Sequence, residues 1–269
     1  MTQSDKVFTG AIPAIYDRFL GPMLFEPYAA DLAARVQALA PVAVLETAAG
    51  TGIVTARLAE ALPEHASITA TDLNQAMIDA AAAKITSSRI TWQACDAMRL
   101  PFADAAFDCV LCQFGVMFFP SKVDAFKEAR RVLKPGGTFL FSVWDNIEYS
   151  PISITISDAV AALYPADPPN FLRRTPFGHH DVAILRNQLV EAGFATVESH
   201  TVTLPTVSPS ARDAAVGQCH GSPLRSEIEA RDPTGLDAAT AATEAALAAR
   251  FGRGPIESTM QAILFTAAG

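Results

Sequence analysis

The chain has 269 residues, of which 50% are hydrophobic and 18% are charged. This composition excludes an intrinsically disordered chain, and at about 150 residues per domain the length predicts one large domain or one domain with a cap. The 20 basic and 28 acidic side chains give a net charge of −8, which argues against a protein that wraps the nucleic-acid backbone.

We expect neither a membrane span nor a secretory signal. No apolar run reaches the roughly 18 residues that a span requires, and the first residues lack a basic region followed by an apolar one. Three of the four cysteines lie in apolar runs, so we expect buried reduced thiols and a cytoplasmic protein. Cys109 and Cys112 would face opposite sides of a strand, and we expect no metal site.

Short apolar runs alternate with helical patterns through the first half of the chain. A helix is predicted over 29–39, before Pro41. Strands are then predicted at 42–46, 68–72, 90–94, 107–112 and 138–143, and helices at 53–62, 76–85 and 123–133. Strands that alternate with helices predict parallel β-α units packed as a doubly wound sheet.

The alternation weakens after residue 143. Residues 145–180 are rich in proline and aromatic side chains and are predicted as a loop, followed by a helix at 181–192 and a strand at 196–204. A polar, partly helical insertion at 205–255 precedes a last strand at 256–267. The fold prediction is α/β: a doubly wound, Rossmann-like, mostly parallel seven-stranded sheet with an antiparallel edge strand and a helical cap.

Three acidic residues follow three successive predicted strands. Glu46 ends the first strand, just before a turn with Gly50 and Gly52, where a carboxylate suits a positively charged ligand better than a pyrophosphate. Asp72 suits a pair of ribose hydroxyls, and Asp96 suits the exocyclic amine of an adenine ring. Each acid alone is equally consistent with a helix cap or a solvated side chain. The combination predicts a ligand crevice at the carboxyl ends of the strands.

With these motifs the chain resembles the class I S-adenosylmethionine-dependent methyltransferases. The segments that carry the resemblance are 44–52 (VLETAAGTG), 71–73 (TDL), 95–102 (CDAMRLPF), 113–120 (QFGVMFFP) and 131–137 (RVLKPGG), with a looser match at 189–194. Their order is similar to the small-molecule branch related to the ubiquinone/menaquinone C-methyltransferases. The resemblance implies S-adenosyl-L-methionine as cofactor and S-adenosyl-L-homocysteine as product.

The resemblance also implies the cofactor-binding residues. They are Glu46, Thr47, Ala48, Gly50, Gly52, Asp72, Leu73, Met77, Asp96, Ala97, Met98, Gln113 and Phe114. Glu46 and Gly50 would lie near the methionine part, Asp72 at the ribose, and Leu73 and Met77 on the adenine. Asp96 and the Ala97 N–H would read the adenine edge, and Gln113 would face the reacting methyl. Ala48 and Ala49 stand where the family often has glycine and cysteine. Alanine is tolerated at these two positions if its φ angle stays negative.

We predict one methyltransferase domain over residues 1–269, although the resemblance itself covers about 42–137. Residues 1–41 would form a helical lid, although the aromatic stretch within it also suits a helix packed on the sheet. Residues 42–144 would form the cofactor-binding core, and 145–180 and 205–255 would cover the substrate. A base is needed only if the acceptor must lose a proton, and His179, His180 and His220 are the candidates, each of which also suits a turn, cap or loop.

The sequence therefore predicts methyl transfer to a small-molecule acceptor by in-line displacement, achieved mainly by positioning. Aromatic residues in the cover segments favour an aromatic or apolar acceptor. Two alternatives stay open: a non-catalytic module that binds the cofactor and acts through a partner, and a nicotinamide-dependent oxidoreductase. Glu46 and the lack of a third turn glycine disfavour the oxidoreductase, and the charge of −8 disfavours a nucleic-acid methyltransferase.

Overall fold

The structure is a computed structural model that describes residues 12–269. The first 11 residues of the predicted lid at 1–41 lie outside the described residues. The chain divides into two compact units. Unit 1 comprises residues up to Pro27, Trp144–His179 and Thr203–Gln261, and unit 2 comprises Tyr28–Val143, His180–Val202 and Ala262–Gly269.

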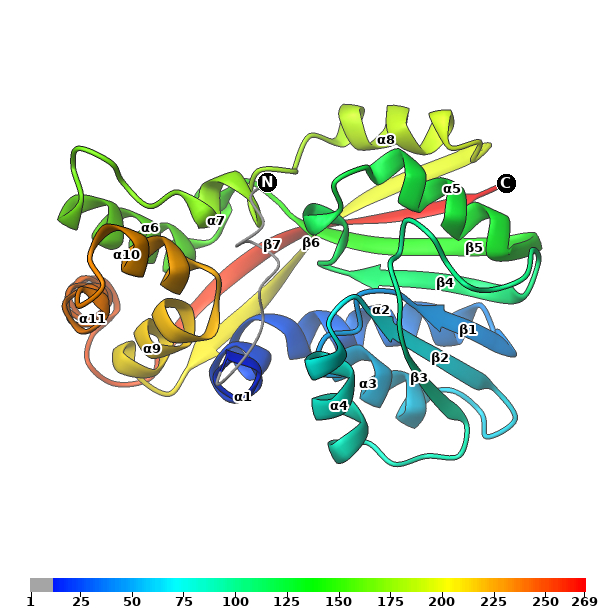
Figure 1. The fold of residues 1–269 in the computed structure, drawn as a ribbon, viewed down its shortest axis with the longest axis horizontal. Helices are drawn as coiled ribbons and strands as arrows, with labels where there is room; N and C mark the ends of the chain where they lie inside the picture. Colours follow the sequence, from blue (N-terminus) through cyan, green and yellow to red (C-terminus); the bar gives the residue numbers. More distant parts are fainter. Residues whose placement is uncertain (1–11) are drawn as a thin grey trace. The chain divides into compact units, whose positions relative to one another are not determined.

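A seven-stranded sheet has the order β3-β2-β1-β4-β5-β7-β6 (Figure 1). Its first five strands are parallel: β1 (Ala43–Glu46), β2 (Ser67–Asp72), β3 (Ile90–Ala94), β4 (Phe107–Gln113) and β5 (Leu133–Trp144). β5 begins five residues before the predicted start at 138, because Phe107 pairs with Leu133 across an irregularity in the ladder. The prediction of a mostly parallel seven-stranded sheet is confirmed.

The last two strands, β6 (Thr196–Ser208) and β7 (Ile256–Ala268), form the antiparallel pair at the edge (Figure 1). The Ala195 N–H, just before β6, donates to the carbonyl of Ala268 at the end of β7, at 3.0 Å. Because β7 lies between β5 and β6, the antiparallel strand is one place in from the edge, and β6 is the edge strand.

Helices cover both faces of the sheet in unit 2. They are α2 (Glu26–Ala38, from Tyr28 onward in this unit), α3 (Ile53–Ala61), α4 (Gln75–Lys84), η3 (Val116–Phe118), α5 (Lys122–Val132) and α8 (Val182–Glu191). On one face, Leu32 of α2 and Leu58 of α3 join the strand residues Val44 and Leu111 in one buried cluster.

The other face of the sheet in unit 2 is filled by phenylalanines. Phe126 of α5 lies with its ring centroid 5.7 Å from that of Phe139 and 5.2 Å from that of Phe141. Phe141 in turn stacks on Phe265 of β7 at 4.8 Å. Leu140, between Phe139 and Phe141, belongs to the cluster on the opposite face, so β5 is buried on both faces, as a doubly wound sheet requires.

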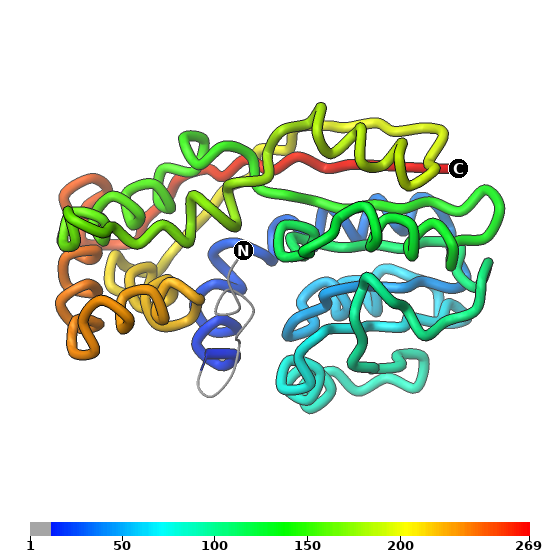
Figure 2. The backbone as a smooth tube through the Cα atoms, turned by 45° about the horizontal axis from the view of Figure 1, so that its top comes forward, coloured from blue at the N-terminus to red at the C-terminus, as the bar shows by residue number. Residues whose placement is uncertain are grey.

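Unit 1 is mainly helical. Its elements are α1 (Ile12–Ile15), η2 (Tyr16–Phe25), η4 (Ile147–Tyr149), α6 (Pro151–Leu163), α7 (Phe171–Arg174), α9 (Ala211–Gly221), α10 (Leu224–Arg231) and α11 (Leu236–Phe251). In Figure 2 the orange trace of α11 runs beside the green trace of α6 and the yellow trace of α9, which it contacts. The N-terminal segment and both predicted cover insertions contribute to this unit.

The helix α6 corrects the prediction of a loop over 145–180. Its isoleucines, serines and single threonine have low helix propensity, and Pro151 would be expected to break a helix. Pro151 instead occupies the first turn, where its missing N–H costs no hydrogen bond. Within residues 12–269, no helix is both long enough and apolar enough to cross a membrane.

Candidate active site

The three acidic residues end or follow three neighbouring strands of unit 2. In the sheet, β3, β2 and β1 lie side by side and run parallel. Glu46 is the last residue of β1 and Asp72 is the last of β2, while Asp96 follows β3 by two residues. Their backbones therefore lie at one edge of the sheet, the edge formed by the carboxyl ends.

Glu46 is a buried carboxyl group that accepts one hydrogen bond from the residues that the structure describes. Only 2% of the residue is exposed, and the Thr55 hydroxyl of α3 donates to Glu46 Oε2 at 2.6 Å. Burial raises the pKa of Glu46 to about 8, since the charged form has lost its water, and the hydrogen bond from Thr55 opposes that rise. Glu46 is therefore poised to ionise when a positive charge comes close.

The turn after Glu46 is left-handed at three places. Ala48, Gly50 and Gly52 have φ angles of +54°, +56° and +81°. The expectation that φ stays negative at Ala48 is therefore wrong: this alanine carries a strain that glycine would avoid. A side chain at Gly52 would also meet Ile85 Cδ1 at 2.7 Å and Trp92 Cη2 at 2.9 Å. The turn is thus packed tightly against its own unit at Gly52.

The outer part of the same turn is open. A Cβ added at Gly50 would meet no atom within 4 Å. Next to it, the hydroxyl of Thr51 is buried and has no hydrogen-bond partner among residues 12–269. Thr47 is 4% exposed, and its hydroxyl donates to the carbonyl of Leu111 at 3.3 Å, so that side chain ties β1 to β4.

Asp72 joins the end of β2 to the glycine turn. Its Oδ2 accepts from the Gly50 N–H at 2.9 Å, and its Oδ1 accepts from the Asn74 N–H at 2.8 Å. Burial is the largest influence on this carboxyl group and raises its pKa. Asn74 Nδ2 donates a second, longer bond to Oδ1, at 3.4 Å. Each carboxylate oxygen can accept two hydrogen bonds, so Oδ2 keeps capacity for a hydroxyl group.

The predicted adenine contacts differ in how much surface they offer. Leu73 is 52% exposed, whereas Met77 is 3% exposed and points into the core. Asp96, Ala97 and Met98 are half-buried. Asp96 Oδ1 accepts from the Met98 N–H at 2.8 Å, and its other oxygen has no partner among the described residues.

Gln113 and Phe114 stand at the end of β4, next to the glycine turn. Phe114 has a φ of +53° and packs edge-on against Tyr28 of α2, with ring centroids 5.4 Å apart. A bulky residue in the left-handed region is a genuine outlier, and such outliers cluster at functional sites. Gly115 follows, and a Cβ there would overlap the Cβ of Ala48.

The histidine candidates do not gather in one unit. His220 belongs to unit 1, where it lies in the last turn of α9 and not in a loop as predicted. Its Nε2 lies 2.9 Å from Thr240 Oγ1; that hydroxyl donates to the Leu236 carbonyl, so His220 Nε2 is the donor. His179 ends a segment of unit 1, and His180 opens one of unit 2. The cap of α8 is Asp181.

Three contributors were missed by the sequence analysis: Thr55, Asn74 and Tyr28. Thr55 occupies the position at which a dinucleotide-binding turn would carry its third glycine or alanine. A hydroxyl in the first turn of the helix after the glycines was a signal that Thr55 could bond Glu46. Asn74 follows Asp72 by two residues, a spacing typical of a local carboxylate turn. Tyr28 could not be predicted, because its partner Phe114 lies far away in the sequence and becomes a neighbour only in the folded protein.

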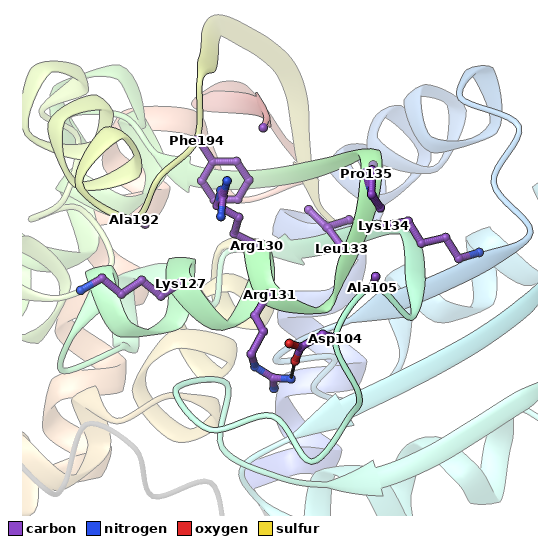
Figure 3. A pocket seen from close by; sticks show the side chains of 12 residues that line it. Asp104, Ala105, Lys127, Arg130, Arg131, Leu133, Lys134, Pro135, Ala192 and Phe194 are labelled. Atoms are coloured by element: carbon purple, nitrogen blue, oxygen red, sulfur yellow. Dashed lines mark hydrogen bonds and ion pairs between the residues drawn. The ribbon is translucent and has the colours of Figure 1, made fainter.

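A pocket of about 590 Å³ in unit 2 lies away from all of these residues (Figure 3). It is lined by Lys127 and Arg130 of α5, by Lys134 at the start of β5, and by Phe194. Because β4 and β5 begin here, this is the opposite edge of the sheet from the acidic residues. No residue of the predicted cofactor site lines it.

Comparisons with known proteins agree with this geometry. Residues 44–137, which contain the glycine turn and all three acids, match the family described as "Methyltransferase domain". The ubiquinone/menaquinone biosynthesis C-methyltransferase UbiE of Pseudomonas fluorescens is 33% identical over 173 residues, which are 60% of this chain and 68% of the relative.

Solved structures share the fold. The YcgJ protein of Bacillus subtilis superimposes with a TM-score of 0.57 at 18% identity, covering 90% of this chain and 97% of its own. A phosphoethanolamine N-methyltransferase 2 of Haemonchus contortus, solved with S-adenosylhomocysteine, gives a TM-score of 0.58 at 16% identity, covering 98% of this chain and 59% of its own. With the family match and the UbiE relative, the chain belongs to the class I S-adenosylmethionine-dependent methyltransferases.

Proposed function

We propose that this enzyme transfers the methyl group of S-adenosylmethionine to a small-molecule acceptor with an aromatic or apolar body. The observation that carries the proposal is the junction of Glu46, Asp72 and the glycine turn, because it combines a buried acid, a hydroxyl-binding acid and an open backbone. The UbiE relatives are named as C-methyltransferases of ubiquinone and menaquinone biosynthesis, which supports an acceptor of this class.

The described residues fit the cofactor. The buried Thr51 hydroxyl has no hydrogen-bond partner among them, as expected of a group that binds the carboxylate of the cofactor. Open space at Gly50 lets a ligand approach the backbone. The buried Glu46 carboxyl suits an ammonium group, and the remaining acceptor capacity of Asp72 Oδ2 suits a ribose hydroxyl.

The cofactor supplies, when bound, a sulfonium methyl that is already activated for in-line attack. The residues of this chain then have to bind, orient and exclude water, and no proton transfer is required unless the acceptor loses one. The Glu46–Thr55 hydrogen bond spans the glycine turn and Asp72 holds Gly50 within it, while Gln113 and Phe114 border the turn from the end of β4. His220 donates its Nε2–H to Thr240, so only its Nδ1 could accept a proton, and burial lowers the pKa of His220 and so makes it a weaker base.

Aromatic side chains in unit 1 support the apolar character of the acceptor. Tyr16 stacks on Phe25 with ring centroids 4.9 Å apart, and the series continues through Trp144 and Phe177 at 6.1 Å for each step. Tyr16 and Phe25 are half-buried.

Two arginines of the predicted cover segment at 145–180 are already paired. Arg173 lies 2.9 Å from Asp158, and Arg174 lies 2.7 Å from Glu227. Because both guanidinium groups are already neutralised by carboxylates, they would attract a strongly anionic acceptor only weakly. This supports the proposal of an apolar acceptor.

The test has two stages. Calorimetric titration with S-adenosylhomocysteine, run beside NAD, is expected to give micromolar binding of the former alone. Purified enzyme with methyl-labelled S-adenosylmethionine is then offered phenols and hydroquinones beside small charged amines, and label is expected in the aromatic acceptors. Label only in charged acceptors overturns the acceptor class, binding of NAD alone overturns the cofactor site, and tight binding without turnover favours a non-catalytic module.

A further inference from the structure

The loop that carries Asp96 is fixed from its far side. It runs from the end of β3 to the start of β4 without a helix or strand. A tight turn opens it, in which the Arg99 N–H donates to the Asp96 carbonyl at 2.9 Å. Leu100 follows at once and is 4% exposed. The position of the turn therefore depends on what holds Leu100.

Arg131, in the last turn of α5, binds this loop at three places. Its Nη2 donates to the Leu100 carbonyl at 2.9 Å, and its Nη1 donates to the Phe102 carbonyl and to Asp104 Oδ1, both at 2.7 Å. Figure 3 shows Arg131 pointing down from α5 to Asp104, away from Arg130 and Lys127. One guanidinium thus spans five residues of the loop.

Glu128 completes the arrangement from one turn earlier in α5. Its Oε2 accepts from the Leu100 N–H at 2.7 Å, so the backbone of Leu100 is held on both sides. The same carboxylate receives the Arg131 guanidinium in two bonds, to Oε1 at 2.8 Å and to Oε2 at 2.7 Å. The pKa of Glu128 is lowered, first of all by the hydrogen bond from Arg131.

A lone ion pair this exposed would stabilise little, since the two side chains are 30% and 21% exposed. The geometry instead lets the pair hold the loop in place. Arginine has five donors in a rigid fork, and here they are shared among two carboxylates and two carbonyls. A lysine has a single nitrogen and cannot satisfy acceptors spread along the loop.

We propose that Arg131 and Glu128 are positioning residues that hold Asp96 and Ala97 where they can read the adenine edge. The proposal rests on the proposed function, in which Asp96 accepts from the adenine amine. Neither residue touches the ligand. They act through Leu100, one residue beyond the Asp96–Arg99 turn, and a shift of about 1 Å in such a support is enough to weaken a directed hydrogen bond.

The test compares two ligands that differ only at the edge read by Asp96. S-inosylhomocysteine carries a carbonyl oxygen where S-adenosylhomocysteine carries the amine. Wild-type protein is expected to bind S-adenosylhomocysteine at least about tenfold more tightly, as for one charge-assisted hydrogen bond. Arg131→Lys and Glu128→Gln are expected to reduce this preference to less than about threefold. Arg35→Lys is the matched control, because Arg35 pairs with Asp31 at 2.7 Å on α2.

The preference ratio separates positioning from simple loss of stability. A variant that loses affinity for both ligands equally, or keeps the wild-type preference, overturns the proposal, and thermal unfolding of each variant is recorded alongside. Asp96→Asn tests the underlying site separately and is expected to reverse the preference, because its amide donates. If wild type shows no preference and Asp96→Asn changes nothing, the adenine assignment itself has failed. If only Asp96→Asn acts, the positioning role alone has failed.

Discussion

Ala48 and Gly115 meet where the turns after β1 and β4 come together, and only one of them has room for a side chain. A Cβ at residue 115 would overlap the Cβ of Ala48 and lie 2.7 Å from Cys112 Sγ. Ala48 has a φ of +54°, and Phe114, beside Gly115, has a φ of +53°. Two strained residues thus border the glycine turn, and the missing side chain of Gly115 is what lets them approach.

Gly115→Ala is expected to destabilise the fold by about 1–3 kcal/mol, the usual range for an overpacked site. The added methyl group would overlap the Cβ of Ala48, which has no rotamer to change, and would lie 2.7 Å from Cys112 Sγ. Urea unfolding measures the change. Gly254→Ala is the control, because a Cβ at Gly254 meets nothing within 4 Å.

The partner variant Ala48→Gly removes one of the two clashing groups and also the left-handed strain. In the Gly115→Ala background it is expected to recover part of the lost stability, so that the two changes are non-additive. Additive effects would show that the two residues do not share this space.

How far the sequence could predict the site follows from the same residues. The positions of Glu46, Asp72 and Asp96 after successive strands were predictable, because strand ends are set by local patterns of apolar residues. The φ of Ala48 was not, since it depends on how the turn packs against Cys112 and Gly115, more than 60 residues away. The role of Arg131 was equally invisible: its acceptors at Leu100, Phe102 and Asp104 become neighbours only in the folded sheet.

Glu46 is expected to make the fold less stable as pH rises. Below pH 4.5, its ordinary pKa, the group is protonated in both states. Between 4.5 and about 8 the unfolded chain has lost the proton while the buried group keeps it, so the free energy of unfolding falls with pH and levels off above about 8. One such proton changes the slope by up to about 1.4 kcal/mol per pH unit. Unfolding of wild type and Glu46→Gln between pH 5 and 9 measures the difference.

Removing the Thr55 hydroxyl tests the pKa of Glu46 in a second way. Because its hydrogen bond lowers the pKa of Glu46, Thr55→Val is expected to extend the sloping region above pH 8. Glu60→Gln serves as control, since that side chain is 67% exposed. Identical pH slopes in wild type and Glu46→Gln would show that Glu46 ionises normally.

Asp72→Ala is expected to weaken binding of S-adenosylhomocysteine by about 1–3 kcal/mol, the cost of leaving hydroxyl groups without a charged acceptor. The same change leaves the N–H groups of Gly50 and Asn74 without their acceptor, so some loss of stability is expected too. Calorimetry below the melting temperature separates the two effects. Asp79→Ala on α4 is the control, and an unchanged dissociation constant in folded Asp72→Ala removes Asp72 from the cofactor site.

His220→Gln is expected to leave the pH profile of kcat unchanged, because the amide can still donate to Thr240. Stability should nevertheless respond to acid. Burial lowers the pKa of His220 below its usual 6.5, with a smaller effect of Arg225 in the same direction. As pH falls below 6.5, His220 takes up a proton in the unfolded chain but stays neutral in the folded protein. Wild type therefore loses stability in this range, and His220→Gln loses less. His65→Gln, at an exposed site, is the control, and loss of kcat in His220→Gln alone would restore His220 as a candidate base.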